Sequence, residues 1–528
     1  MSVGVSNGTN TQSREGVGAG AMRGSQQHFT TDHLLTDLKG RTISSGFVTI
    51  SAQAGKFVLM LSSTMVLARL LTPRDFGLVA MVTTVVGFLR VFKDAGLSIA
   101  TVQREKITHA QVSNLFWINL GVSALGSLAL AGSAWIIARF YHNSQLVPIA
   151  LFLSLTFVIS GSTFQHQALL KRQMRFKALA VIEVGSMAFS VVVGIAMAAS
   201  GYGYWSLVWS TLAAEVASLI LTWSISQWRP RFPTRGSGVG PLVTFGAHKT
   251  AGDLVMSVAR GADNLLIGRF FGSAALGLYS RAGALLVRPL EQLLIPINTV
   301  MIPALSRLQS QPERYRATFF RAYEAIALFA FFGAGLLLAL ARPLTAVLLG
   351  PKWQQAAVIF AAFTIAALSI PMAYVSGWLF TSQGRGRDMM TTQVINAFVT
   401  LGSYIVGLPF GPLGVAFAFS ISGPCLRIPI SYFFAGRRGP VKAADLWRIF
   451  LVHLPVWAAV VAGTAVARSM VIHLRPVYQL LICAPVGVIV GIALILILSP
   501  QRRVAVYLFR TLREVVRLKQ TGLRTAMA

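Results

Sequence analysis

Cysteine and acidic residues are scarce in this chain, which has 2 Cys and 16 Asp plus Glu in 528 residues. Cys425 and Cys483 both lie inside apolar runs, so they support neither a disulfide framework nor a cysteine metal site. The sequence also lacks a Walker loop, a zinc-protease helix and a nucleophile elbow. These absences predict a protein that is not an enzyme and that has no cofactor and no bound metal.

What the chain has instead is apolar sequence. It is 55% hydrophobic and 12% charged, with a mean hydropathy of +0.66, which is typical of membrane proteins. Its formal net charge of +30 would suggest a nucleic-acid partner in a soluble protein. Here the basic residues gather in alternate loops between apolar stretches, so we expect membrane lipids and no nucleic acid as partners.

Stretches of about 20 apolar residues predict about fourteen membrane spans. Two sets of six spans lie within 45–229 and 236–434, and an extra pair lies within 448–499. Residues 1–44 are expected to be a disordered tail, and 500–528 a basic amphipathic tail that suits an anionic leaflet or simply orients the chain. The positive-inside rule then places both termini in the cytosol.

An internal repeat relates the two sets of spans. At an offset of 200 residues an arginine, a glycine and a leucine coincide, as Arg69/Arg269, Gly77/Gly277 and Leu78/Leu278. Since about six spans separate the copies, both copies have the same orientation in the membrane. The sequence therefore predicts an all-α polytopic membrane protein in which two parallel six-helix lobes surround a central cavity.

Ionisable residues inside the predicted spans mark a candidate site. A charge at the bilayer centre costs about 3 kcal/mol, so these side chains must pair, reach the surface or line a wet cavity. The candidates for substrate binding are Lys56, Arg90, Lys249, Arg260, Arg281 and Arg288. The candidates for ion coupling or switch pairing are Asp253, Asp263 and Glu291. Positive charge predominates, which predicts an anionic ligand because arginine binds phosphate oxygens bidentately.

Each candidate also has a simpler structural interpretation. Lys249 with Asp253, and Arg260 with Asp263, have the spacing of helical pairs that neutralise each other. Arg69 is expected to cap a helix end rather than to contact substrate. Three acids stand isolated within spans and are either proton-coupling carboxylates or neutral hydrogen-bonded acids: Glu183, Glu215 and Glu324.

Several segments resemble the Wzx-type polysaccharide flippases, over roughly 45–440 of the chain. They include Arg69-Leu-Leu-Thr-Pro-Arg-Asp-Phe-Gly77 and the segments 115–119, 166–177, 201–208 and 263–272. The resemblance implies the fold of the multidrug/oligosaccharidyl-lipid/polysaccharide exporters. It also implies movement of undecaprenyl-diphosphate-linked oligosaccharides between leaflets by alternating access, for exopolysaccharide, O-antigen or capsule synthesis.

Two alternatives to a flippase stay open. A drug/cation antiporter of the same superfamily would favour an acidic cavity, and the positive excess disfavours it. A membrane assembly factor or polymerase of a polysaccharide pathway would favour large outside loops, whereas the outside loops here are short. For the flippase we expect a monomer whose substrate is the lipid-linked oligosaccharide, with a polysaccharide polymerase and glycosyltransferases as further partners.

Overall fold

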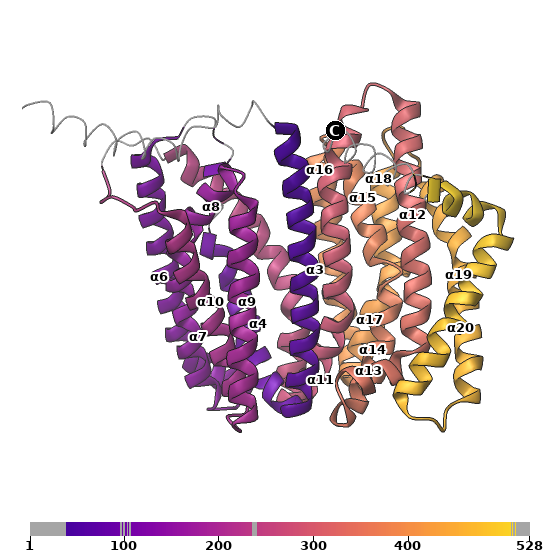
Figure 1. Ribbon diagram of the computed structural model, residues 1–528, viewed down its shortest axis with the longest axis horizontal. Coiled ribbons are helices and arrows are strands. Elements are labelled where there is room, and N and C mark those ends of the chain that lie inside the picture. Colours follow the sequence, from indigo (N-terminus) through magenta and orange to yellow (C-terminus); the bar gives the residue numbers. More distant parts are fainter. Residues whose placement is uncertain are drawn as a thin grey trace, which may run out of the picture. The chain divides into compact units, whose positions relative to one another are not determined.

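The structure is a computed structural model that describes most of the chain (Figure 1). The described residues are 38–94, 98, 101–102, 104, 107–234, 240–507, 509–510 and 513. Side chains are described from residue 51 onward, except at 91–97, 99–100, 240–256, 288, 293 and 296. In this part of the chain every regular element is a helix, which confirms the all-α prediction. The predicted tails lie mostly outside these ranges.

The chain divides into two compact units. Unit 1 contains the chain before Thr64 together with Val82–Val258, and unit 2 contains Thr64–Met81 and the chain from Ala259 onward. Three helices contribute residues to both units, namely α3 (Leu38–Leu70), α4 (Pro73–Asp94) and α11 (Gly240–Arg307). The domain limits expected from the sequence remain predictions.

In the described part of unit 1 five further helices follow: α6 (His109–Tyr141), α7 (Leu146–Gly161), α8 (Phe164–Arg172), α9 (Phe176–Ala199) and α10 (Trp205–Ser226). Helix α6 packs against α7, and α9 packs against α10 (Figure 1). Small polar residues allow the second contact, because Ser190 and Ser210 each donate a hydrogen bond to the other's carbonyl, at 2.9 and 3.0 Å. Such reciprocal bonds hold two apolar helices in a fixed register.

Unit 2 is built mainly from nine helices: α12 (Pro312–Ala339), α13 (Ala341–Leu348), α14 (Gln354–Ala366), α15 (Ile370–Ser382), α16 (Gly386–Gly407), α17 (Gly411–Ser422), α18 (Ile428–Gly436), α19 (Ala443–Met470) and α20 (Pro476–Ile497). A π-helical turn, Gly423–Arg427, joins α17 to α18. Helix α12 packs against α19, and α19 packs against α20 (Figure 1). The last two helices are the extra pair that the sequence predicts.

Ten helical segments of the described chain are long and apolar enough to cross a membrane. The protein is therefore a multi-pass membrane protein. One of these segments, Gly386–Gly436, covers two of the predicted spans, and α3 and α4 are not among the ten. The count of about fourteen spans thus remains a prediction.

Helix α11 contains two helices that meet at a kink, and it covers two of the spans that the sequence predicts. The helix runs from Gly240 to Arg307, and its backbone leaves helical geometry at Gly272, with φ 79° and ψ −177°. A left-handed φ of this kind favours glycine. Asp263 lies on the helix before the kink, and Arg281 and Glu291 lie on the helix after it.

Candidate substrate site

Lys56 forms an ion pair within unit 1. Its Nζ lies 2.6 Å from Oε2 of Glu183, and the two side chains are 21% and 48% exposed. Lys56 lies on α3 and Glu183 on α9, and the two residues are 127 positions apart in the chain. The interpretation of Glu183 as an isolated acid is wrong, because Lys56 neutralises it in this conformation.

Arg90 lies on α4 in unit 1 and is exposed. One turn earlier, the Gly87 carbonyl accepts a hydrogen bond from the Ser257 hydroxyl of α11 at 3.2 Å, so these two helices adjoin there. The side chains of Lys249, Asp253 and Arg288 lie outside the described ones. Their roles, and the expected pairing of Lys249 with Asp253, stay predictions.

Arg281 is half-buried in unit 2 against an aromatic ring. Its guanidinium carbon lies 4.1 Å from the ring centroid of Phe76. Phe76 in turn meets Trp353 edge-on, at 5.4 Å between centroids, and the Trp353 indole donates a 2.8 Å hydrogen bond to the Ala68 carbonyl. A cation over a partly desolvated ring gains about 1–2 kcal/mol. Phe76 therefore holds the Arg281 side chain in place.

The segment that carries Phe76 is fixed by two close contacts in unit 2. Arg69 donates a 3.0 Å hydrogen bond to the Val347 carbonyl in the last turn of α13, which confirms its predicted capping role. Gly77 and Gly277, which the repeat aligns, pack backbone against backbone. A Cβ on Gly77 would lie 1.6 Å from the Ser273 carbonyl oxygen. Both positions therefore need glycine.

Arg260 and Glu291 are both exposed in unit 2. Tyr374 of α15 lies close enough to each of them for an electrostatic interaction. Arg260 and Glu291 lie on opposite sides of the kink at Gly272 in α11.

Asp263 uses different partners from the one that helical spacing suggests. Its Oδ2 accepts a 2.9 Å hydrogen bond from the Tyr279 hydroxyl, and its Oδ1 accepts one of 2.7 Å from the Asn264 amide. Among the described residues, Arg260 is not one of its ion-pair partners, so the expected Arg260–Asp263 pair is wrong. The Tyr279 hydroxyl stabilises this carboxylate away from water.

Arg427 is a half-buried cation in unit 2 that the sequence-based selection missed. It ends the π-helical turn, donates a 2.7 Å hydrogen bond to the Phe419 carbonyl, and places its guanidinium carbon 4.1 Å from the Phe419 ring centroid. Tyr404 stacks on the same ring at 5.7 Å and interacts electrostatically with both Arg427 and Asp263. An arginine three residues after Pro424, inside an apolar span, is the signal that could have found it.

Comparison with known proteins identifies the family. Residues 66–358, more than half of the chain, match the family described as polysaccharide biosynthesis protein. The chain belongs to this family. The segments of this chain that resemble the Wzx-type flippases lie in the matched region, so the resemblance is confirmed at the family level.

Relatives and solved structures agree with this family. The lipopolysaccharide biosynthesis protein WzxC of Escherichia coli (strain K12) is 23% identical over 432 residues, which cover 79% of this chain and 86% of that protein. The succinoglycan biosynthesis transport protein ExoT of Rhizobium meliloti (strain 1021) is 26% identical over 366 residues, covering 69% and 74%. The structure of the lipid II flippase MurJ in an inward closed conformation matches with a TM-score of 0.66 at 15% identity, covering 85% of this chain and 98% of that one. This polysaccharide biosynthesis protein therefore shares the fold of that flippase.

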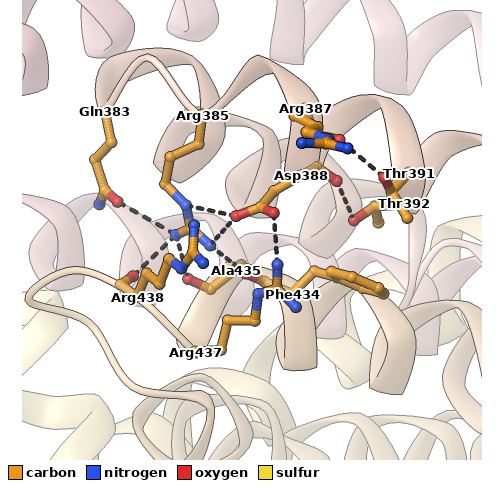
Figure 2. Close-up of polar contacts among 10 residues, drawn as sticks. All are labelled: Gln383, Arg385, Arg387, Asp388, Thr391, Thr392, Phe434, Ala435, Arg437 and Arg438. Atoms are coloured by element: carbon orange, nitrogen blue, oxygen red, sulfur yellow. Dashed lines mark hydrogen bonds and ion pairs between the residues drawn. The ribbon is translucent and has the colours of Figure 1, made fainter.

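A second charged cluster in this polysaccharide biosynthesis protein surrounds Asp388 at the start of α16 (Figure 2). Arg385 reaches one carboxylate oxygen with two nitrogens, at 3.0 and 2.9 Å, and Arg437 reaches the other at 2.8 Å. The side chains of Arg385 and Asp388 are 11% and 10% exposed. Arg385 also donates to the carbonyls of Ala435 and Arg438, at 2.8 and 2.9 Å. The cluster ties the α15–α16 turn to the end of α18.

The α15–α16 turn has a counterpart in unit 1, the α8–α9 turn. In both, a residue with left-handed φ precedes an arginine: Met174 at 53° before Arg175, and Gly384 at 68° before Arg385. The two arginine amides donate to the carbonyl five residues earlier, at 3.0 and 2.8 Å, which closes a Schellman turn. This shared geometry is structural support for the internal repeat.

Proposed function

We propose that this polysaccharide biosynthesis protein is a flippase for undecaprenyl-diphosphate-linked oligosaccharide repeat units. It would act in a bacterial inner membrane, with both termini in the cytosol, during exopolysaccharide, O-antigen or capsule synthesis. The family match over residues 66–358 carries the proposal. The fold shared with a lipid II flippase supports a transporter rather than an enzyme.

The cationic candidates supply the chemistry that a diphosphate needs. Arg260 is exposed, Arg281 is half-buried, and Lys56 is 21% exposed beside Glu183. Guanidinium groups bind phosphate oxygens in bidentate fashion, and ammonium groups add a point charge. In this proposal Lys56 exchanges Glu183 for the substrate diphosphate, while Arg90, Lys249 and Arg288 complete the set.

The acidic candidates have a separate role in the proposal. Glu291 interacts electrostatically with Tyr374, and Asp263 accepts a 2.9 Å hydrogen bond from Tyr279. Such acids change partners when a nearby charge arrives, which suits ion coupling or a switch of pairing. Asp253 belongs to this group by its position in the sequence. Glycosyltransferases would act before the monomeric flippase, and a polysaccharide polymerase would act after it.

Substitution of the binding arginines tests the proposal. Arg281→Ala and Arg288→Ala should each abolish export of the polysaccharide in cells while the abundance of the protein in the membrane stays normal. Arg475→Ala, at an exposed arginine between α19 and α20, is the matched control and should export normally. Normal export by both the Arg281 and the Arg288 variants would remove these residues from the mechanism.

A further inference from the structure

The α8–α9 turn presents three exposed cations at the edge of the membrane. Lys171, Arg175 and Lys177 are all exposed. The turn joins the membrane-crossing segments Leu146–Arg172 and Phe176–Ala199, so it lies where lipid headgroups are found. At the opposite end of α9, residues 200–204 contain no Lys or Arg. Cations therefore concentrate at one end of these helices.

Among the described residues, these three cations have no acidic partner like the one in the matching turn of unit 2. None of them makes an ion pair or a side-chain hydrogen bond with another residue of the described chain. In unit 1 the described acidic side chains are Glu183 and Glu215, and Glu183 is paired with Lys56. The fourth basic residue of the turn, Arg172, is buried and donates to the Thr101 carbonyl at 3.2 Å, so it is structural.

The internal repeat identifies the position at which the two turns differ. In unit 2 the carboxylate of Asp388, three residues after Arg385, neutralises that arginine. The corresponding residue three positions after Arg175 is Ala178. The two turns have the same backbone geometry, but the guanidinium is paired with a carboxylate in the unit 2 turn and with none of the described carboxylates in the unit 1 turn.

We propose that Lys171, Arg175 and Lys177 form a docking surface for the phosphate headgroups of anionic phospholipids. Clusters of cations next to a membrane span attract anionic lipids, by on the order of 5-fold in affinity for each Lys or Arg near the surface. The free guanidinium provides bidentate phosphate contacts and the two lysines add charge on either side. This surface is independent of which substrate the protein transports.

The test compares lipid retention by purified full-length protein. Native mass spectrometry, after equilibration with equal amounts of phosphatidylglycerol and phosphatidylcholine, should show preferential retention of phosphatidylglycerol by the wild type. The triple variant Lys171→Gln/Arg175→Gln/Lys177→Gln should lose at least about 10-fold of that preference, as the per-cation effect implies. The double variant Arg342→Gln/Arg475→Gln, which removes exposed cations elsewhere, should retain it.

A second variant uses the repeat itself. Ala178→Asp keeps all three cations and adds the carboxylate found in unit 2, so it should lower the preference several-fold by occupying Arg175. Circular dichroism and size exclusion establish folding, and Arg175→Gln alone replaces the triple variant if the latter does not fold. Wild-type preference in both the Ala178→Asp and the glutamine variants would overturn the proposal. Unchanged phosphatidylglycerol retention with weakened binding of a polyprenyl diphosphate would also overturn it and would assign the turn to substrate.

Discussion

The α8–α9 turn of unit 1 and the α15–α16 turn of unit 2 have the same backbone geometry but differ in how their arginine is surrounded. The arginine is exposed in the first turn and paired with a carboxylate in the second. Arg175 and Arg385 have φ/ψ of −79°/57° and −87°/53°. Arg385 is enclosed by a carboxylate and several carbonyls (Figure 2), whereas Arg175 is exposed. The repeat therefore preserves a helix-capping geometry, while the charged side chains around the turn differ between the two units. Backbone hydrogen bonds thus determine the geometry of the turn, and the neighbouring side chains determine whether its arginine is paired.

The largest effect is expected when the Asp388 carboxylate of the unit 2 turn is removed. Asp388→Ala leaves Arg385, whose side chain is 11% exposed, and Arg437, whose side chain is 39% exposed, without their shared anion. An unpaired buried charge such as that of Arg385 is destabilising. We expect a clearly lower melting temperature in detergent and a several-fold loss of membrane abundance.

The natural control for this variant is unit 1, where Ala178 already stands in the corresponding position. Asp388→Asn keeps the shape and separates the lost charge from lost packing. A melting temperature for Asp388→Ala equal to that of the wild type would show that the cluster contributes nothing to stability.

The left-handed residue of each turn gives an effect of intermediate size. Gly384→Ala should destabilise the protein by about 1 kcal/mol, because a Cβ is unfavourable at this φ although nothing lies within 4 Å of it. Met174→Gly, the converse change in unit 1, should be neutral or slightly stabilising. Thermal unfolding followed by tryptophan fluorescence measures both, and a stabilising Gly384→Ala would contradict the shared geometry.

The smallest effect is expected at the free arginine of unit 1. Arg175→Ala should change the free energy of unfolding by less than about 0.5 kcal/mol, since this exposed side chain has no partner in the described chain. Thermal unfolding beside Arg385→Ala, which should be much less stable, checks the contrast. Equal losses for the two arginines would mean that the turns are electrostatically alike.

Much of the fold could be predicted from the sequence because apolar length and helical spacing are local properties. The extra pair of helices and the capping role of Arg69 follow from such local patterns. The two helices on either side of Gly272 in α11 form although ionisable residues such as Asp263 lower their hydropathy.

The side-chain partners were harder to predict. Lys56 meets Glu183 across 127 residues, and Asp263 takes a tyrosine in preference to the arginine one turn before it. Arg427 depends on a π-helical turn, which hydrophobic periodicity does not detect. Spacing along one helix identifies charged faces, but the choice of partner depends on how separate helices pack.

The central claim is that this protein carries lipid-linked repeat units from the cytosolic to the periplasmic leaflet. The most direct measurement is the leaflet distribution of undecaprenyl-diphosphate-linked repeat units in cells that lack the protein, with the wild type restored as the control. We predict that the repeat units accumulate in the cytosolic leaflet and that the wild-type protein, but not Arg281→Ala, returns them to the periplasmic leaflet. An unchanged periplasmic pool in the deletion strain would contradict the account.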